Sequence, residues 1–324
     1  MRNKTLDQSR LIAAFMVVLI HSPLPYFFGG IFESLARFAV PFFFMISGYY
    51  ATSNREKLKK SIKKTAWLLL WSVVMYFVWE LAWSLYRHNT ADMIKECFSP
   101  KALIDTLVFN NGALLGHLWF ILALLYCYLI YIAIFTKASS RVKLVVGISL
   151  LILSFTLREI LRGSGISDTT HYTRNFLFTG IPFFLIGNVI SEKWTDLSKI
   201  KSGYFVCVLA LGVVATVAER FLYSISDLYI GTVLISIGFF VLSVKKNLPT
   251  LEFLSETGRK YASDIYVFHV MIIGAINVLC SVLGLLTNTV FLFARPIIVL
   301  VLSIIIALVK EKILEFIKNK KRTI

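Results

Sequence analysis

The sequence RLIAAFMVVLIHSPLPYFF, residues 10–28, decides the fold class, because an apolar run of this length is typical of a membrane-spanning helix. Arg10 and His21 stand eleven positions apart in it. At about 100° per residue they project from nearly the same face of a helix, and at about 1.5 Å per residue they lie about 16 Å apart along its axis. Ionisable groups at membrane depth are costly and usually face a polar cavity. The pattern therefore predicts a protein that binds an anion at one membrane face and either catalyses a reaction or transports a solute deeper in the membrane.

The composition is that of an integral membrane protein. Hydrophobic residues make up 57% of the 324 residues and charged residues 16%, with a mean hydropathy of +0.76. A soluble domain carries about 25% charged residues. Outer-membrane barrels would show alternating segments of about ten residues, which the sequence lacks. The composition therefore predicts an all-α, polytopic membrane protein. Its four cysteines form no CxxC motif and predict neither a metal site nor a disulfide framework.

About ten transmembrane helices can be drawn, and they make the chain a single membrane domain over residues 1–324. The predicted spans are about 8–28, 36–51, 63–86, 116–135, 141–157, 174–190, 202–218, 228–244, 263–285 and 289–309. Residues 310–324 are predicted to form a basic cytoplasmic tail, with a linker to a further cytoplasmic domain as the alternative.

The distribution of basic residues predicts the orientation. With the N-terminus in the cytoplasm, the cytoplasmic segments hold 24 of the 34 lysines and arginines, and the outside loops hold six. This asymmetry is typical of the positive-inside rule and puts both termini in the cytoplasm. It also accounts for the net charge of +16 without a nucleic-acid partner.

Titratable side chains within the predicted spans are the candidates for chemistry. Neutral His21 can act as a general base near pH 7, and the alternative is a histidine that hydrogen-bonds a neighbouring helix. Glu80 needs a partner at its depth, so it either pairs with an arginine of another span or orients His21.

Two further segments carry histidines at membrane depth. His117 opens the fourth span beside Trp119, a tryptophan that an aromatic belt also explains. His269 follows Tyr266 in the ninth span. Each histidine is either a direct participant or a packing residue.

Basic residues near the membrane surfaces are the candidates for anion binding. Arg10 is either a ligand for an anion or an arginine that reaches back to the interface. Arg37 lies near the outer face, ahead of Ser47-Gly48, for which close helix packing is the preferred interpretation. The lysine run that includes Lys60 and Lys63 either contacts acidic lipid headgroups and sets topology, or binds a phosphorylated cofactor.

Taken together, these residues resemble the acyltransferase 3 family of membrane proteins over nearly the whole chain. The opening residues are similar to its R-x10-H signature, and later segments are similar to R-F-x-V-P-x-F-F-x-x-S-G and to a basic R-x-x-R. The matching segments are Leu6-Asp7 with Arg10 and His21, Arg37 through Gly48, Lys60-Ser-Ile-Lys63, His117-Leu-Trp-Phe120, and Gly258 through His269.

The resemblance implies ten helices in a bacterial cell membrane and an acyl donor, usually acetyl-coenzyme A, bound from the cytoplasm. The acyl group passes to an acceptor hydroxyl of the cell envelope at the outer side. The resemblance assigns His21 as the base and Arg10, Lys60 and Lys63 as donor contacts. Lys60 and Lys63 stand where the family has arginines, and lysine lacks the bidentate fork of arginine. We further predict that Glu80 takes part in catalysis. The predicted acceptor contacts are Arg37, His117, Trp119, Tyr266 and His269.

The start of the chain, with Asp7 through Arg10 and residues 39–50, also resembles the membrane domain of vancomycin-resistance serine racemases, which belongs to the same family. This resemblance implies a domain that supplies L-serine across the membrane to a cytoplasmic racemase. The sequence thus predicts an O-acyltransferase, with an L-serine carrier as the alternative. A scaffold with a decayed site is a third possibility, against which the intact R-x10-H pattern argues. The acceptor stays open among peptidoglycan, a surface polysaccharide, a lipid-linked sugar and a small amino acid.

Overall fold

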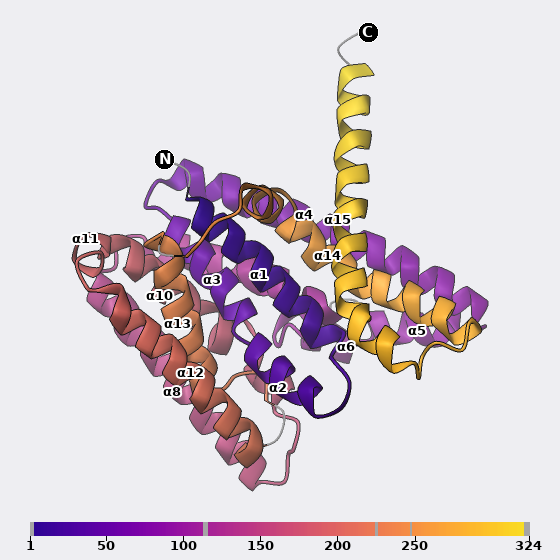
Figure 1. Cartoon of the computed structure of the whole chain (residues 1–324), viewed down its shortest axis with the longest axis horizontal. Helices are drawn as coiled ribbons and strands as arrows, with labels where there is room; N and C mark the ends of the chain where they lie inside the picture. The colour runs from indigo at the N-terminus through magenta and orange to yellow at the C-terminus, as the bar shows by residue number, and fades with distance from the viewer. Residues whose placement is uncertain (1–2, 113–115, 224–225, 247, 321–324) are drawn as a thin grey trace. The chain divides into compact units, whose positions relative to one another are not determined.

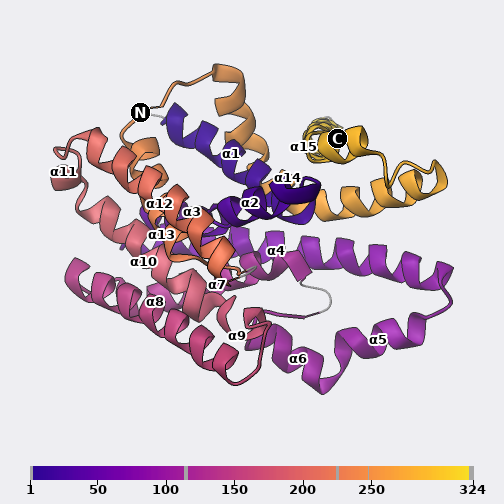
Figure 2. The same cartoon turned by 60° about the horizontal axis from the view of Figure 1, so that its bottom comes forward.

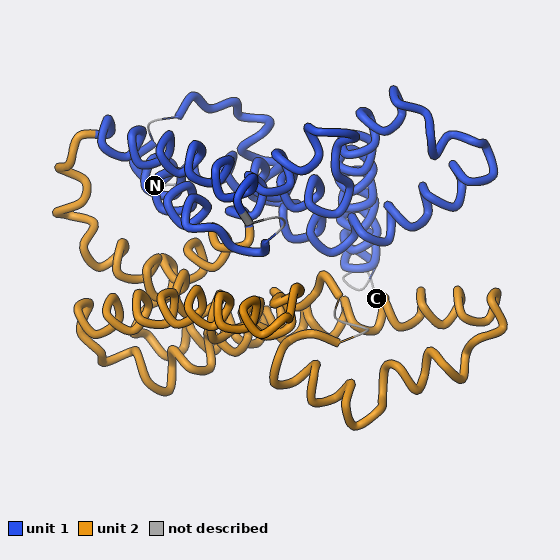
Figure 3. The backbone as a smooth tube through the Cα atoms, turned by 90° about the horizontal axis from the view of Figure 1, so that it is seen from below, with its two compact units in different colours: residues 1–39, 202–324 blue, residues 40–201 orange. Residues whose placement is uncertain are grey.

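The chain folds into α-helices that form two compact units (Figure 3). The computed structural model describes residues 3–112, 116–223, 226–246 and 248–320, and within these ranges it contains helices and no β-strand. Residues 1–39 and 202–324 form unit 1, and residues 40–201 form unit 2.

Unit 1 joins the beginning of the chain to its last third (Figure 1). Helix α1 packs lengthwise against α14, α12 packs against α13, and α14 packs against α15. The helices of unit 1 are α1 (Lys4–His21), α2 (Tyr26–Ala36), α12 (Ser202–Tyr223), α13 (Ile230–Val244), α14 (Glu252–Val282) and α15 (Thr289–Lys320).

A glycine sets the closest approach in unit 1. A Cβ atom added to Gly258 of α14 would lie 2.0 Å from the backbone oxygen of Asp7 in α1. Only a residue without a side chain lets the two backbones meet there, as in other small-residue helix contacts of membrane proteins. Gly258 therefore sets the position along α1 at which α14 packs.

Unit 2 holds the middle of the chain, in which α4 packs against α7 and α8 packs against α10 (Figure 2). Its helices are α3 (Ala39–Tyr50, of which Ala39 belongs to unit 1), α4 (Arg55–Tyr86), α5 (Thr90–Phe98), α6 (Pro100–Leu107), the 3-10 turn η1 (Gly116–Leu118), α7 (Trp119–Ile130), the π-helical turn η2 (Tyr131–Phe135), α8 (Ser140–Gly163), α9 (Thr170–Thr173), the π-helical turn η3 (Phe176–Gly180), α10 (Ile181–Glu192) and α11 (Trp194–Leu197).

Glycines also bring α3 and α10 into contact. A Cβ on Gly48 would lie 1.8 Å from the backbone oxygen of Phe184, and one on Gly187 would lie 2.1 Å from that of Met45. The interpretation of Gly48 as a helix-packing residue is confirmed.

The helices confirm the predicted fold class, an all-α polytopic membrane protein. In the described residues, seven helical stretches are long and apolar enough to cross a membrane, and Phe176–Glu192 and Ile230–Val244 are shorter apolar helices. Each of the ten predicted spans overlaps one of these stretches or α1. The number of spans and the cytoplasmic position of both termini stay predictions.

The first predicted span, 8–28, ends earlier than expected, at His21. The N–H of Ser22 still bonds to the Val18 oxygen at 2.8 Å, but Pro23 and Pro25 follow. Proline lacks an N–H, and it disfavours helical backbone in the residue before it. The chain starts again as α2 at Tyr26, which has a φ of 59°. His21 is therefore the last residue of its helix.

Candidate functional site

Helix α1 carries Arg10 and His21 together, as the spacing predicted. Its start is fixed by Asn3, whose side-chain oxygen accepts the N–H of Leu6 at 3.1 Å, a capping bond. Arg10 donates through Nη1 to Asp7 Oδ1 at 2.9 Å, one turn back on the same helix, and its side chain is 23% exposed. A guanidinium carries five N–H donors, so a partly exposed one can contact a carboxylate and an anionic ligand together.

His21 lies beside His269, a pairing that the sequence did not predict. Their ring centroids are 5.1 Å apart, with His269 fully buried and His21 exposed. Nδ1 of His269 lies 2.7 Å from the Tyr266 oxygen and 3.2 Å from the Ile265 oxygen. Since a carbonyl oxygen only accepts, we assign the proton to Nδ1, which leaves the lone pair of the neutral ring on Nε2. Three of the predicted site residues, His21, Tyr266 and His269, thus lie together in unit 1.

Arg295 is a residue of this site that was not singled out in the sequence. It sits in α15 and donates through Nε to Ser22 Oγ at 2.9 Å. Ser22 is fully buried and directly follows His21. A charged residue inside an apolar helix is itself a reason to suspect function, and that rule would have pointed to Arg295.

Arg37, the predicted acceptor contact near the outer face, lies between two carboxylates of unit 1. Its Nη2 donates to Glu33 Oε1 at 2.5 Å, and its Nη1 donates to Asp227 Oδ1. All three side chains are more than four-fifths buried. Buried arginine is normally found in such pairs, and here the pairs join the end of α2 to the segment before α13.

The predicted donor contacts Lys60 and Lys63 lie in the first turns of α4, in unit 2. Both side chains are exposed, and residues three apart share one face of a helix. Helix α4 begins with Asn54, whose side-chain oxygen accepts the N–H of Lys57 at 3.1 Å. An exposed basic face of this kind can attract phosphate groups, since lysine binds phosphate as a point charge.

His117 and Trp119 are both buried in unit 2, where α7 begins. The ring of His117 packs edge to face against that of Tyr76, with the ring centroids 4.6 Å apart. Tyr76 lies one turn before Glu80 on α4. The guanidinium of Arg174 lies 5.5 Å from the centre of a Trp119 ring, a cation–π contact.

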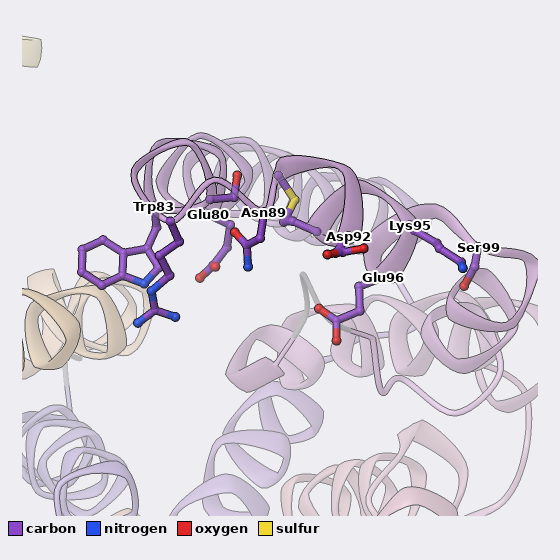
Figure 4. Close-up of a pocket in the computed structure, with 10 residues that line it drawn as sticks. Glu80, Trp83, Asn89, Asp92, Lys95, Glu96 and Ser99 are labelled. Carbon is purple, nitrogen blue, oxygen red and sulfur yellow. The ribbon is translucent and has the colours of Figure 1, made fainter.

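Glu80, the predicted second catalytic residue, lines a pocket of about 600 Å³ at the end of α4 (Figure 4). Asp92 and Glu96 of α5 bring two more carboxylates to it. Burial, and then the charges of Glu96 and Glu80, raise the pKa of the Cys97 thiol on α5. The remaining lining residues are Trp83, Ser84, Arg87, Asn89, Met93, Lys95 and Ser99. Pockets of this size commonly bind small molecules, and this lining can hydrogen-bond hydroxyl groups.

A buried lysine forms the centre of a polar cluster in unit 2, and the sequence predicted for it only a place in a cytoplasmic segment. Lys143 of α8, with a side chain 1% exposed, donates to Asn188 Oδ1 at 2.8 Å and to Glu192 Oε1 at 2.5 Å. Asn188 donates in turn to the backbone oxygens of Gly48 and Ala51, each at 3.1 Å. The cluster therefore ties α8 and α10 to the end of α3, which four residues separate from the start of α4.

The predicted site residues thus fall into two groups. Unit 1 contains Arg10, His21, Arg37, Tyr266 and His269, and unit 2 contains Lys60, Lys63, Glu80, His117 and Trp119. Nowhere in the described parts of the chain do three His, Cys, Asp or Glu residues cluster in a way that could hold a metal ion.

Comparison with known proteins places this arrangement in a family. Residues 3–310 match the family model described as an acyltransferase domain. The chain is 38% identical over 139 residues to a serine/alanine racemase of Enterococcus gallinarum, an alignment that covers 39% of this chain and 18% of that protein. It is 29% identical over 209 residues to an amino-acid racemase of Enterococcus faecalis, covering 58% of this chain and 28% of that protein. The chain therefore spans only a minor part of these relatives. No solved structure matches it. Because the family model covers nearly the whole chain, this protein belongs to the acyltransferase 3 family of membrane proteins.

Proposed function

We propose that this protein is a membrane O-acyltransferase that moves an acyl group, acetyl in the simplest case, from cytoplasmic acyl-coenzyme A to an acceptor hydroxyl at the outer side. Membership of the acyltransferase family supports the reaction class. The single observation that carries the proposal is helix α1, which holds Arg10 and His21 on one rigid element, with His21 as its last residue.

The chemistry needs one base and one displacement. His21 removes the proton of the acceptor hydroxyl as its oxygen attacks the thioester carbonyl carbon. The carbon–sulfur bond then breaks, and the coenzyme A thiolate leaves with the proton returned by the imidazolium. General base catalysis of this kind contributes about 10²–10⁴-fold.

Arg10, Lys60 and Lys63 hold the phosphates of the donor in this proposal. The acceptor contacts come from Arg37, His117, Trp119, Tyr266 and His269, and Glu80 assists catalysis. Phosphate attracts exposed cations strongly, and charge-assisted hydrogen bonds are about twice as strong as neutral ones.

The test replaces the base and keeps the donor contacts. In purified protein, His21→Asn is expected to lower acyl transfer from acetyl-coenzyme A at least ~100-fold. The affinity for coenzyme A, measured by calorimetry, should stay within about twofold, because His21 lies about 16 Å from Arg10 along α1. His88→Asn is the matched control, since His88 lies in the turn between α4 and α5 with a φ of 58°, a backbone conformation that asparagine tolerates. Unchanged transfer in His21→Asn would refute the assignment of the base.

A second candidate function is an L-serine carrier, the membrane part of a longer racemase. The similarity to racemases of Enterococcus favours it. It predicts L-serine uptake by vesicles that contain the purified protein and no acyl donor. Uptake under these conditions, together with no thioester turnover on any hydroxyl acceptor, would replace the enzyme proposal by the carrier.

A further inference from the structure

In the described part of the chain, Arg295 is a cation whose charge no carboxylate balances. Within the ranges that the structure describes, no Asp or Glu lies in salt-bridge distance of it, and its one hydrogen bond is donated by Nε to the neutral hydroxyl of Ser22. The other arginines of the unit 1 site differ, because Arg10 pairs with Asp7 and Arg37 pairs with Glu33 and Asp227. An unbalanced guanidinium within an apolar helix attracts an anion.

The contact with Ser22 orients this guanidinium. Ser22 is fully buried at the end of α1, so its hydroxyl holds Nε in a fixed place. The two terminal nitrogens of Arg295 carry four further N–H groups in a planar fork. Such a fork, already fixed at one nitrogen, loses little freedom when it binds an oxygen anion.

Through Ser22, the guanidinium of Arg295 lies near His21, the proposed base. Ser22 directly follows His21, and the His21 ring lies 5.1 Å from that of His269. Helices α1, α14 and α15, all of unit 1, therefore bring two imidazoles and one guanidinium to the same end of α1.

We propose that Arg295 is the catalytic residue that stabilises the oxyanion of the reaction. The inference rests on the proposed acyl transfer. As the acceptor oxygen bonds to the thioester carbon, the carbon–oxygen double bond becomes single and its oxygen gains a negative charge. The terminal nitrogens of Arg295 donate to that oxygen. When the double bond re-forms, the electron pair leaves with the coenzyme A sulfur, and the proton held on His21 passes to it. Ser22 is the positioning residue that holds the guanidinium.

Two other roles for Arg295 make different predictions. A purely structural arginine would only tie the end of α1 to α15, so its loss would lower stability and every activity alike. An arginine that binds a carboxylate of the acceptor would raise the acceptor KM and leave kcat unchanged. An oxyanion donor acts only in the transition state, so its loss lowers kcat, and for such donors the loss is about 10²–10³-fold.

The experiment uses the full chain, purified in lipid nanodiscs. Release of the coenzyme A thiol from acetyl-coenzyme A is followed with L-serine, N-acetylglucosamine and N-acetylmuramic acid as acceptors. The variants are Arg295→Ala, Arg295→Lys and Ser22→Ala. Arg220→Met is the matched control, because Arg220 is a half-buried arginine at the end of α12 in the same unit. Thermal midpoint and affinity for coenzyme A report folding in every variant.

We expect kcat to fall about 10²–10³-fold in Arg295→Ala and less in Arg295→Lys, which keeps the charge without the fork. The kcat of Ser22→Ala should lie between that of Arg295→Lys and that of the unaltered protein. The kcat of Arg220→Met should stay within about twofold of the unaltered value. Added methylguanidinium should restore part of kcat in Arg295→Ala and none in His21→Asn. A structural arginine would not give this rescue.

Each other outcome overturns the inference in a distinguishable way. If the unaltered protein releases no thiol with any acceptor, the proposed function fails, and the oxyanion role fails with it. If that protein is active and Arg295→Ala keeps its kcat with a raised acceptor KM, only the oxyanion role fails. If kcat falls in Arg295→Ala and Arg295→Lys in proportion to the fall in thermal midpoint, and methylguanidinium restores none of it, then Arg295 has a structural role only.

Discussion

In the proposed donor site, Arg10 is a guanidinium that the Asp7 carboxylate orients, whereas Lys60 and Lys63 are two exposed point charges. Arg10→Ala is expected to weaken coenzyme A binding by about 1.5–3 kcal/mol, the range for hydrogen bonds to charged groups. Lys60→Gln/Lys63→Gln should also weaken it, and calorimetry measures both. Pantetheine, which has no phosphates, should bind all variants equally weakly.

The control for donor binding is Lys199→Gln, which removes an exposed lysine from the same unit as Lys60 and Lys63. Its affinity for coenzyme A should not change. Equal affinity in Arg10→Ala and in the double lysine variant would reject the three residues as phosphate contacts.

Lys143 contributes to stability in a way that an exposed lysine does not. Lys143→Met leaves Asn188 and Glu192 without their shared donor, and breaking a buried pair in this way costs about 3–5 kcal/mol. Glu192 is 35% exposed, which favours the lower end of that range. Lys59→Met is the matched control, because its pair with Glu56 is exposed and contributes less than about 1 kcal/mol.

Unfolding of both lysine variants is measured in mixed micelles of increasing denaturing detergent. Lys143→Met/Glu192→Gln should recover part of the loss, since it removes the unpaired charge. Equal stability of Lys143→Met and Lys59→Met would show that the buried cluster carries no stability.

At the scale of elements, the contact between α1 and α14 depends on Gly258. Gly258→Ala puts a methyl group 2.0 Å from the Asp7 backbone oxygen, so one helix must shift. Overpacking of this kind costs about 1–3 kcal/mol. Asp7 also holds Arg10, so we expect weaker coenzyme A binding as well as a lower thermal midpoint.

Gly203→Ala is the control for this change. Gly203 lies in α12, and a Cβ there meets nothing within 4 Å. Alanine is the better helix former by about 1 kcal/mol, so this variant should be as stable as the unaltered protein or more so. A Gly258→Ala protein with unchanged midpoint and donor affinity would contradict the tight crossing.

The sequence predicted helices better than their ends. Long apolar runs identify a buried or membrane helix whatever surrounds it, so all ten predicted spans overlap helices. The end of α1 at His21 was not predicted. Apolar residues continue after Pro23 and Pro25, so the hydropathy pattern extended the span past the point where these prolines end the helix. Helix α15 runs to Lys320, beyond the predicted limit of 309, because a basic amphipathic segment can stay helical outside the apolar run.

Over the whole molecule, the sequence could not predict pairings between distant residues. Arg10 and His21 share one helix, so helix periodicity alone relates them. Ser22 and Arg295 are 273 positions apart, and only tertiary packing brings them together. Lys143 was placed in a cytoplasmic segment, and its burial could not be predicted because Glu192 and Asn188 of another helix supply its partners.

The orientation of the whole molecule decides whether the donor can reach its contacts. The excess of basic residues, 24 against six, predicts that the 55–64 segment is cytoplasmic and the 87–115 segment lies outside. Reporter fusions at Asn54 and His88, which lie in the turns before and after α4, should give cytoplasmic and external signals respectively. A fusion at Asn319, near the end of α15, should be cytoplasmic. The reverse pattern would place Lys60 and Lys63 outside, away from the cytoplasmic coenzyme A pool, and the proposed direction of acyl transfer would fail even if His21 were essential.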